Sequence, residues 1–357
     1  MTTVELGLLI FLGLFSSAMV GVLRVPLSRY ALDTPKERSS HTEATPRGGG
    51  CAIWIAYSIG LIVLMKIGRI EVPTFIGFLG AGSLAMFSGL FDDIAKDGIK
   101  AETRLILQII AIAWAIFWLG GVEQVQIGSV VWKWGYVEQI LLALAMLWVI
   151  NITNFMDGLN GLASSEVIFV AGIAGLLAWA SGDALSLLLC TLLVATTTGF
   201  LPWNIRNAKI FLGDSGAYFL GMMIALLALT SAQTGSVSPW CWMILFAIFL
   251  GDSTVAKIRR MAGNIKAWKE PHDTHAYNHL SRYWNSHGKV TIAMSAMNVT
   301  VLAPLAIVAW RYPQWSVGIA LVTFAAMATL AVYFGSGVER NHSSSRIRTN
   351  EDGNLET

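Results

Sequence analysis

The sequence predicts an all-α polytopic membrane protein, and three observations carry that prediction. Hydrophobic residues make up 55% of the 357 residues, charged residues only 13%, and the mean hydropathy is +0.61. Soluble proteins carry about twice that share of charge. The apolar residues gather in runs of roughly 17–22, each long enough to cross ~30 Å of hydrocarbon as a helix. The sequence lacks the period-two alternation of a membrane β-barrel, so helices are the expected spanning elements.

Eleven spans are expected. They cover residues 4–23, 48–65, 73–91, 104–120, 137–153, 162–180, 184–201, 216–234, 239–257, 289–309 and 314–335. The connections then alternate sides, and 20 of the 24 Lys and Arg residues fall on one side. The positive-inside rule makes that side cytoplasmic, with the N-terminus periplasmic and the C-terminus cytoplasmic. The first run has no positive n-region and no small-residue cleavage site, so it is expected to be a retained helix.

Residues 1–335 are expected to form a single integral-membrane domain, and residues 336–357 a polar, disordered cytoplasmic tail. The longest cytoplasmic connection, residues 258–288, is too short to form a core of its own. Cys51, Cys190 and Cys241 all lie in apolar runs and indicate neither a disulfide framework nor a zinc site.

Six polar clusters stand at the ends of apolar runs, and all six fall on the predicted cytoplasmic side. They are Pro46-Arg47-Gly48-Gly49-Gly50, Asp92-Asp93 with Lys96, Asn154 to Gly161, Gly213-Asp214-Ser215-Gly216, Asp252-Ser253, and His272 to His279. A chain that only resides in lipid has no need to collect acids, amides and imidazoles on one face. The pattern therefore predicts an active site assembled from loops at the cytoplasmic face.

Asp92 and Asp93 follow the third span. Two adjacent carboxylates at a membrane edge repel each other unless a cation or a proton resolves the conflict, so the pair suits a divalent metal or its complex with a polyphosphate. Lys96 lies one turn further on and suits a phosphate as a point charge. The alternative is a solvated acidic helix cap.

Asn154, Asp157 and Asn160 are spaced three apart, so they form one stripe if the preceding helix continues. Amide and acid groups in a row suit the polar edges of a nucleotide or a sugar. Gly158 and Gly161 admit close backbone approach. The alternative is a polar turn between two spans.

Asp214 lies between glycines at the start of the eighth span. Either Asp214 or Ser215 is able to cap that helix. A carboxylate at a helix N-terminus is equally suited to a hard cation bound to phosphate, because magnesium takes one or two protein carboxylates and completes its shell with water and phosphate oxygens.

His272, His275, Tyr277 and His279 form the densest cluster, with three of the six histidines of the chain. A cysteine partner and an HExxH motif are both missing, which disfavours catalytic zinc. Imidazoles among lysines and an arginine suit an anionic diphosphate instead. The alternative is a surface loop without a chemical role.

Arg47 precedes three glycines at the start of the second span, where free backbone N–H groups would suit a phosphate. The segment lacks the Lys-Ser/Thr ending of a P-loop, so it is not a nucleotide-hydrolase signature.

Asp252 lies near the inner end of an otherwise apolar span, where an ionisable group is costly unless it is paired or faces a polar cavity. Arg259 and Arg260 are the expected partners, and a ligand contact is the alternative.

Taken together, these clusters resemble the polyprenyl-phosphate N-acetylhexosamine-1-phosphate transferase family, in glycosyltransferase family 4, which includes WecA-type and WbpL-like enzymes and the related MraY-type enzymes. The resemblance covers roughly residues 1–335, with the motifs in the same order. It implies a ten- or eleven-span helical fold with a cytoplasmic active site in the bacterial inner membrane. It further implies transfer of a sugar 1-phosphate from a UDP-sugar to undecaprenyl phosphate, with release of UMP and dependence on Mg²⁺ or Mn²⁺.

The resemblance assigns roles residue by residue. Asp92 and Asp93 match the aspartate pair, of which one is a candidate base, and Asp214 matches the magnesium ligand. Asn154 and Asp157 match a nucleotide-side motif, whereas Asn160 departs from the second aspartate that many members carry. His272, His275 and Tyr277 resemble the HxxHxY-type loop of the branch that initiates O-antigen. The peptidoglycan branch has three adjacent histidines there, which argues against MraY-type function.

The sequence thus predicts that Asp214 holds magnesium, that Lys96, His272, His275 and Arg47 offset phosphate charge, and that a lipid phosphate near Asp92 and Asp93 attacks in line. A covalent aspartyl-phosphate intermediate is the competing mechanism. The rival classes are an MraY-type transferase, a secondary transporter and a lipid-binding assembly protein. No nucleic-acid partner is expected, and the sequence decides neither the N-acetylhexosamine nor whether a homodimer forms.

Overall fold

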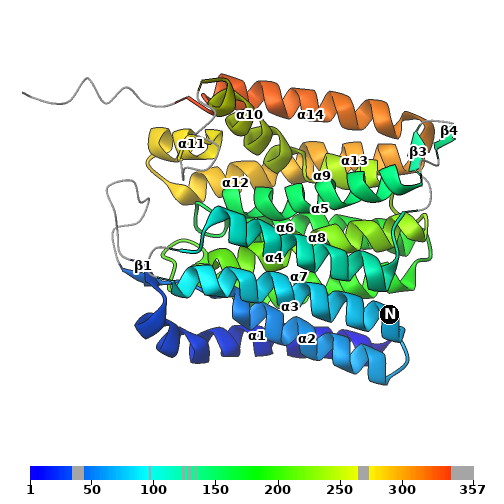
Figure 1. Ribbon diagram of the computed structural model, residues 1–357, viewed down its shortest axis with the longest axis horizontal. Helices are drawn as coiled ribbons and strands as arrows, with labels where there is room; N and C mark the ends of the chain where they lie inside the picture. The colour runs from blue at the N-terminus through cyan, green and yellow to red at the C-terminus, as the bar shows by residue number, and fades with distance from the viewer. Residues whose placement is uncertain are drawn as a thin grey trace, which may run out of the picture.

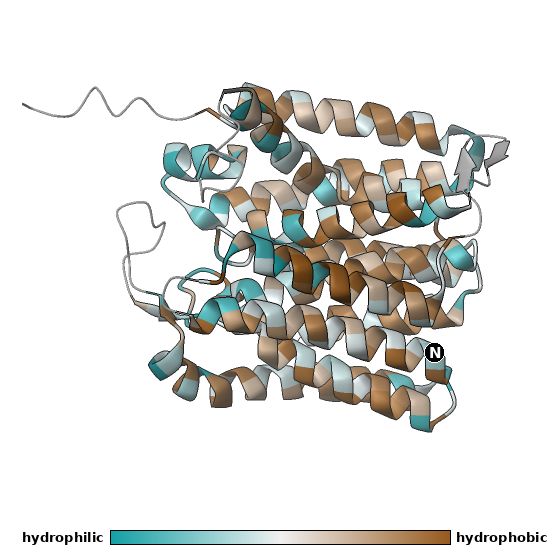
Figure 2. Cartoon of the chain, in the orientation of Figure 1, coloured by the Kyte–Doolittle hydropathy of each residue, from teal (hydrophilic) through white to brown (hydrophobic). Residues whose placement is uncertain are grey.

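Long helices run side by side through the molecule, with apolar residues along their middle and polar residues gathered at both ends (Figures 1 and 2). The structure, a computed structural model, describes residues 1–33, 44–95, 98–122, 125–127, 130–132, 135–263 and 273–338. A helical bundle that crosses a bilayer needs such an apolar band, because the band contacts the hydrocarbon core while the polar ends contact water.

The helices are bounded as follows. They are α1 (Thr3–Tyr30), α2 (Gly50–Lys66), α3 (Val72–Ile94), α4 (Ala101–Leu119), α5 (Tyr136–Phe155), α6 (Leu162–Ala180), α7 (Ala184–Asn204), α8 (Gly213–Gln233), α9 (Pro239–Leu245), α10 (Ala247–Gly263), α11 (Ala276–Trp284), α12 (His287–Met297), α13 (Ala303–Arg311) and α14 (Ser316–Tyr333). A π-helical turn, η2 (Asn298–Leu302), joins α12 to α13, and a 3₁₀ turn, η3 (Pro313–Trp315), precedes α14.

Nine helical segments in the described part of the chain are long and apolar enough to cross a membrane, which makes this a multi-pass membrane protein. The shorter apolar helix α2 and the pair α9 and α10 occupy the two remaining ranges in which spans were predicted. The predicted continuous helix over residues 239–257 is wrong, because α9 and α10 meet at an angle of 77°. Phe246 lies at this break and is as apolar as its neighbours, so hydropathy gives no sign of the bend.

Helix α8 forms the centre of the bundle. Of its most apolar 18-residue window, 89% is buried, against 17% for α1 at the lipid-facing edge. It packs against α3, α5 and α2, and glycines let it approach closely. A Cβ atom on Gly50 would overlap Gly216, and one on Gly89 would overlap the backbone of Asp214. These contacts fix the start of α8 between α2 and α3.

Two short antiparallel ladders complete the described elements. Strands β1 (Leu32–Asp33) and β2 (Thr45–Pro46) pair at one end of the bundle, with Leu32 opposite Pro46. Strands β3 (Val125–Ile127) and β4 (Val130–Trp132) pair at the opposite end (Figure 1).

The segments in which the polar clusters lie meet at one end of the bundle, on the left in Figure 1. We call it the site end, and it is formed by residues 44–50, 92–95, 154–161, 204–213 and 273–287. Ser336 is fully buried there, so the packed region extends past residue 335, where the sequence analysis ended it. Residues 339–357 of the predicted tail lie outside the described residues.

Candidate active site

Asp93 caps the central helix from a neighbouring helix. Its two carboxylate oxygens accept from the backbone N–H groups of Asp214, at 2.9 Å, and of Ser215, at 3.0 Å. Helix α8 has no side-chain cap of its own, so the alternative interpretation, in which Asp214 or Ser215 only caps this helix, is wrong. A carboxylate at this position satisfies two otherwise unpaired donors and complements the positive end of the helix dipole.

Asp92 and Asp214 face each other across the interface between α3 and α8, with their carboxylates within hydrogen-bonding reach. Asn154, at the end of α5, donates from Nδ2 to Asp214 Oδ1 at 2.8 Å. Asp92 also accepts from the backbone N–H of Ile99 at 2.7 Å. The structure therefore brings together three of the predicted site residues from three different helices.

Two arginines lie beside this acidic cluster. Arg104, in the first turn of α4, is 3.8 Å from Asp92 Oδ2. Arg47 forms an ion pair with Asp33 at 2.6 Å and retains 43% side-chain exposure. Burial opposes the charge on Arg47, but its hydrogen bond to Asp33 and the charges of Asp33, Asp214 and Asp93 raise its pKa. Both guanidinium groups are therefore fixed cations next to three carboxylates.

Two of the three glycines after Arg47 do not present free backbone donors, contrary to expectation. The N–H of Gly49 donates to the carbonyl of Phe211, and that of Gly50 donates to the carbonyl of Leu212, both at 3.0 Å. These bonds join the start of α2 to the segment that leads into α8. The reason is steric, since only glycine allows α2 and α8 to approach this closely.

The turn between α5 and α6 carries Asp157 and Asn160. Burial, followed by the negative charge of Asp93, raises the pKa of Asp157 well above its usual value, and Arg47 opposes this only in part. The side-chain amide of Asn160 donates to the carbonyl of Arg206, while its own backbone carbonyl accepts from Thr291 at 3.3 Å. Asp157 thus belongs to the acidic cluster, whereas Asn160 ties the turn to its neighbours.

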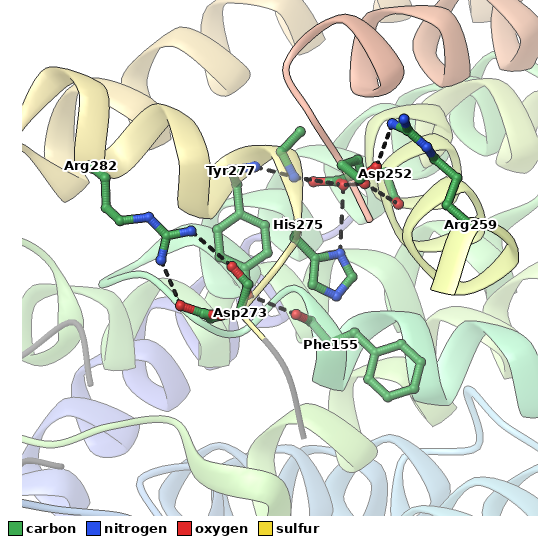
Figure 3. Close-up of polar contacts among 9 residues, drawn as sticks. Phe155, Asp252, Arg259, Asp273, His275, Tyr277 and Arg282 are labelled. Atoms are coloured by element: carbon green, nitrogen blue, oxygen red, sulfur yellow. Dashed lines mark hydrogen bonds and ion pairs between the residues drawn. The ribbon is translucent and has the colours of Figure 1, made fainter. Parts of the chain in front are cut away.

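The histidine segment packs over this turn. The ring of His275 stacks on that of Tyr277, with centroids 5.4 Å apart and an interplanar angle of 15°. The hydroxyl of Tyr277 donates to the carbonyl of Phe155 at 2.9 Å (Figure 3). Burial raises the pKa of Tyr277, so the phenol remains a neutral donor. Gly158 is required beneath it, because a Cβ atom there would overlap the phenol.

Asp252 is bound to this same segment. Arg259, one of its expected partners, instead donates to the carbonyl of Ser336 at 2.9 Å (Figure 3). The carboxylate of Asp252 accepts from backbone and hydroxyl groups, at 2.6–3.2 Å. The expectation that Arg259 neutralises Asp252 is therefore wrong, because hydrogen-bond donors at the start of α11 and the end of α14 satisfy the carboxylate.

The predicted site residues thus fall into three groups. Those in or beside the acidic cluster are Asp92, Asp93, Asp214, Asn154, Asp157 and Arg47. Asn160 lies in the turn, His275 and Tyr277 lie behind it, and His279 lies beside Gly335 after α14. Lys96 and His272 lie outside the described residues.

Sequence reasoning did not single out Arg104 or Lys257. Lys257 Nζ lies over the ring of Phe155, 5.1 Å from its centroid. Neither residue belongs to one of the polar clusters. Only its position, at the cytoplasmic end of a predicted span, could have indicated a role in the site.

In the acidic cluster, Asp92 and Asp214 are the two carboxylates that would hold a divalent cation. Two carboxylates that face each other away from bulk water repel unless a proton or a cation lies between them, and Asp92 and Asp214 have this arrangement. Within the described residues, no group of three or more acidic, histidine or cysteine side chains could hold a metal. Magnesium commonly takes one or two carboxylates and completes its shell with phosphate and water.

Comparison with known proteins identifies similar sequences. The model of a family described as glycosyl transferase family 4 matches residues 75–232, the stretch from α3 to α8 that contains all four aspartates of the cluster. A decaprenyl-phosphate N-acetylglucosaminephosphotransferase of Mycobacterium leprae is 29% identical over 315 residues, 78% of this chain and 76% of the relative. Residues 75–232 thus match glycosyltransferase family 4, and the similarity to this relative extends over most of the chain.

Further relatives come from both branches considered above. A probable undecaprenyl-phosphate N-acetylglucosaminyl 1-phosphate transferase of Bacillus subtilis is 29% identical over 274 residues, 74% of each chain. A phospho-N-acetylmuramoyl-pentapeptide-transferase of Moorella thermoacetica is 30% identical over 207 residues, 55% of this chain and 64% of the relative. The first similarity extends over more of the chain than the second.

Proposed function

We propose that this protein transfers an N-acetylhexosamine 1-phosphate from a UDP-sugar to undecaprenyl phosphate and releases UMP. The supporting observation is the pair Asp92 and Asp214, flanked by Asn154, Arg47 and Arg104, at the ends of apolar helices. One substrate is anchored in lipid and the other is soluble, so they are able to meet only at a membrane surface. The site end is such a surface, which we assign to the cytoplasmic face of the bacterial inner membrane.

Asp92 and Asp214 would hold magnesium, or manganese in its place. The bound ion would neutralise the diphosphate and the departing UMP. The side chains of the protein supply the remaining charge balance, with Arg104 and Arg47 available to phosphate oxygens. Asn154 keeps Asp214 oriented through their hydrogen bond.

The reaction proposed is a direct in-line transfer. An oxygen of the lipid phosphate forms a bond to the β-phosphorus, and the bond from that phosphorus to the bridging oxygen breaks, so UMP leaves with the electron pair. Asp93 is occupied by two backbone N–H groups, which leaves Asp92 as the member of the pair able to position the lipid phosphate or accept its proton. Catalysis then depends on positioning and electrostatic stabilisation.

The deciding experiment measures UMP release by purified protein with undecaprenyl phosphate, Mg²⁺ and a panel of UDP-N-acetylhexosamines. Asp214→Asn and Asp92→Asn should each lower kcat about 100-fold or more, since each removes charge from the metal and phosphate site. Glu71→Gln is the matched control, because Glu71 is an exposed acid at the opposite end of α3. Turnover without added divalent metal, or full activity of Asp214→Asn, would contradict the proposal.

The panel also distinguishes the MraY-type alternative, to which the similarity over 207 residues gives some weight. UDP-N-acetylmuramoyl pentapeptide is included as a donor for this reason. The histidine segment lacks three adjacent histidines, so we expect no turnover with it. Turnover with a UDP-N-acetylhexosamine would place the enzyme at the start of O-antigen or another surface polysaccharide.

A further inference from the structure

Asp252 is a buried acid that the proposed chemistry does not use. It lies in α10, between apolar residues, and is 4% exposed. A carboxylate in such a position is stable only if several donors replace the water it has lost. The identity of those donors therefore shows what Asp252 holds in place.

The first two donors are backbone N–H groups at the start of α11. Ala276 N donates to Asp252 Oδ1 at 2.9 Å, and Tyr277 N donates to Oδ2 at 3.2 Å (Figure 3). His275, the residue that precedes this helix, makes no side-chain cap, so Asp252 caps α11 from another helix. His275 Nδ1 also lies 3.5 Å from Asp252 Oδ1.

The next donor comes from the turn after α14. Ser336 Oγ donates to Asp252 Oδ1 at 2.6 Å, and the N–H of Gly337 donates to the carbonyl of Thr274 at 2.7 Å. One carboxylate thus joins α10, the segment before α11, and the turn after α14. Since those segments are anchored on both sides, the position of the Tyr277 ring is fixed.

Tyr277 transmits this anchoring to the site. Its hydroxyl bonds to the carbonyl of Phe155, the residue between Asn154 and the rest of the turn that carries Asp157. Asn154 in turn bonds to Asp214. Two hydrogen bonds and a short stretch of backbone therefore separate Tyr277 from the proposed metal ligand.

We infer that Asp252 is a positioning residue for the transfer reaction: without touching a substrate, it fixes the start of α11 so that Tyr277 braces the turn that carries Asn154 and Asp157. This inference rests on the function proposed above. In this role, Asp252 and the histidine segment together support the turn between α5 and α6.

The test compares Asp252→Asn with Asp273→Asn. Asparagine keeps the size of the side chain but turns one acceptor into a donor that faces a backbone N–H. Asp273 is the matched control, because it lies in the segment before α11 that Asp252 holds but forms an exposed pair with Arg282. We expect Asp252→Asn to lower kcat about 10- to 100-fold at nearly unchanged KM for both substrates, as for a small misplacement of reacting groups, and Asp273→Asn to stay within about twofold of wild type.

Hydrogen–deuterium exchange supplies a readout that does not depend on turnover. In Asp252→Asn, the amides of residues 276–278 and also those of residues 155–161 should exchange faster than in wild type. Faster exchange confined to α11, or a loss of activity that only follows the amount of folded protein, would overturn the inference. If wild-type protein turned over no donor, the proposed function would fail, and the exchange pattern would still decide whether Asp252 supports the turn.

Tyr277→Phe keeps the inference testable if Asp252→Asn does not fold. This change removes only the hydroxyl that bonds to Phe155 and leaves the ring stack in place. It should lower kcat about tenfold and loosen residues 155–161 without loosening residues 276–278. In the double variant the losses should be less than additive, because both changes break one chain of contacts. Full activity of Tyr277→Phe would overturn the inference.

Discussion

Asp92 and Asp93 are adjacent in sequence, yet their surroundings give them different tasks. Asp93 is 8% exposed and its two oxygens accept from the first N–H groups of α8. Asp92 faces Asp214 and Arg104. Successive residues of a helix point in directions about 100° apart, so one of the pair turns toward the packed interface and the other toward the acidic cluster.

Asparagine at position 93 should therefore destabilise the protein as well as inactivate it. The side-chain NH₂ of the asparagine would face a backbone N–H of α8. A buried donor left without an acceptor lowers the free energy of unfolding by about 1–3 kcal/mol. We expect a lower midpoint of thermal unfolding in detergent for Asp93→Asn. Asp92→Asn should melt close to wild type while losing turnover. Equal melting temperatures for the two variants would contradict this division of tasks.

Helices are also held together at the end of the bundle opposite the site. Asp183 caps α7 by accepting from the N–H of Ser186 at 3.0 Å, and its other oxygen accepts from Thr234 and Ser236, both at 2.7 Å. Those two residues belong to the connection between α8 and α9. A single carboxylate therefore links the start of one helix to the end of the central one.

The stabilising effect of Asp183 should depend on pH. Burial opposes its charge, but the hydrogen bonds from Thr234, Ser186 and Ser236 lower its pKa in the folded state. Its contribution is thus complete above the ordinary carboxyl pKa of about 4 and is lost as the pH falls through the lowered value. We expect Asp183→Asn to melt below wild type at pH 7, with a difference that shrinks below about pH 4, and to keep its turnover. A constant difference from pH 7 to pH 3 would argue against this assignment.

Much of this element-level organisation is predictable from sequence, because the length and apolarity of a run specify a spanning helix. The bend at Phe246 is not, since no proline or glycine marks it. The partners of Asp252 could not be read either, because Ser336 lies 84 residues further along the chain. For the acidic cluster, the motifs identified the residues, but only the fold shows that Asp93 caps α8 and that Asp92 meets Asp214.

The whole molecule has one polar end that carries the site and an opposite end at which β3 and β4 pair. The distribution of Lys and Arg predicts that the site end faces the cytoplasm. Seven spans separate Glu71 from Asp273 in the predicted topology, so these residues should lie on opposite sides of the membrane. Both are described residues with accessible side chains.

Cysteine labelling in cells checks this topology. The native cysteines, Cys51, Cys190 and Cys241, are buried, so their background should be low. A membrane-impermeant maleimide added to intact spheroplasts should label Glu71→Cys, whereas Asp273→Cys should react only after permeabilisation. The reverse pattern would invert the orientation, and labelling of both from one side would show that the number of spans between them is even.

The bond between Asp252 and Ser336 has a consequence for biogenesis. A membrane protein is inserted from its N-terminal end, so every aspartate of the cluster is in place before Ser336 leaves the ribosome. Until α14 arrives, the carboxylate in α10 lacks its hydroxyl donor, and the segment before α11 lacks the N–H of Gly337. Insertion of the last helix is then the event that completes the enzyme, and a chain interrupted before it would carry the chemical groups without the arrangement that makes them useful.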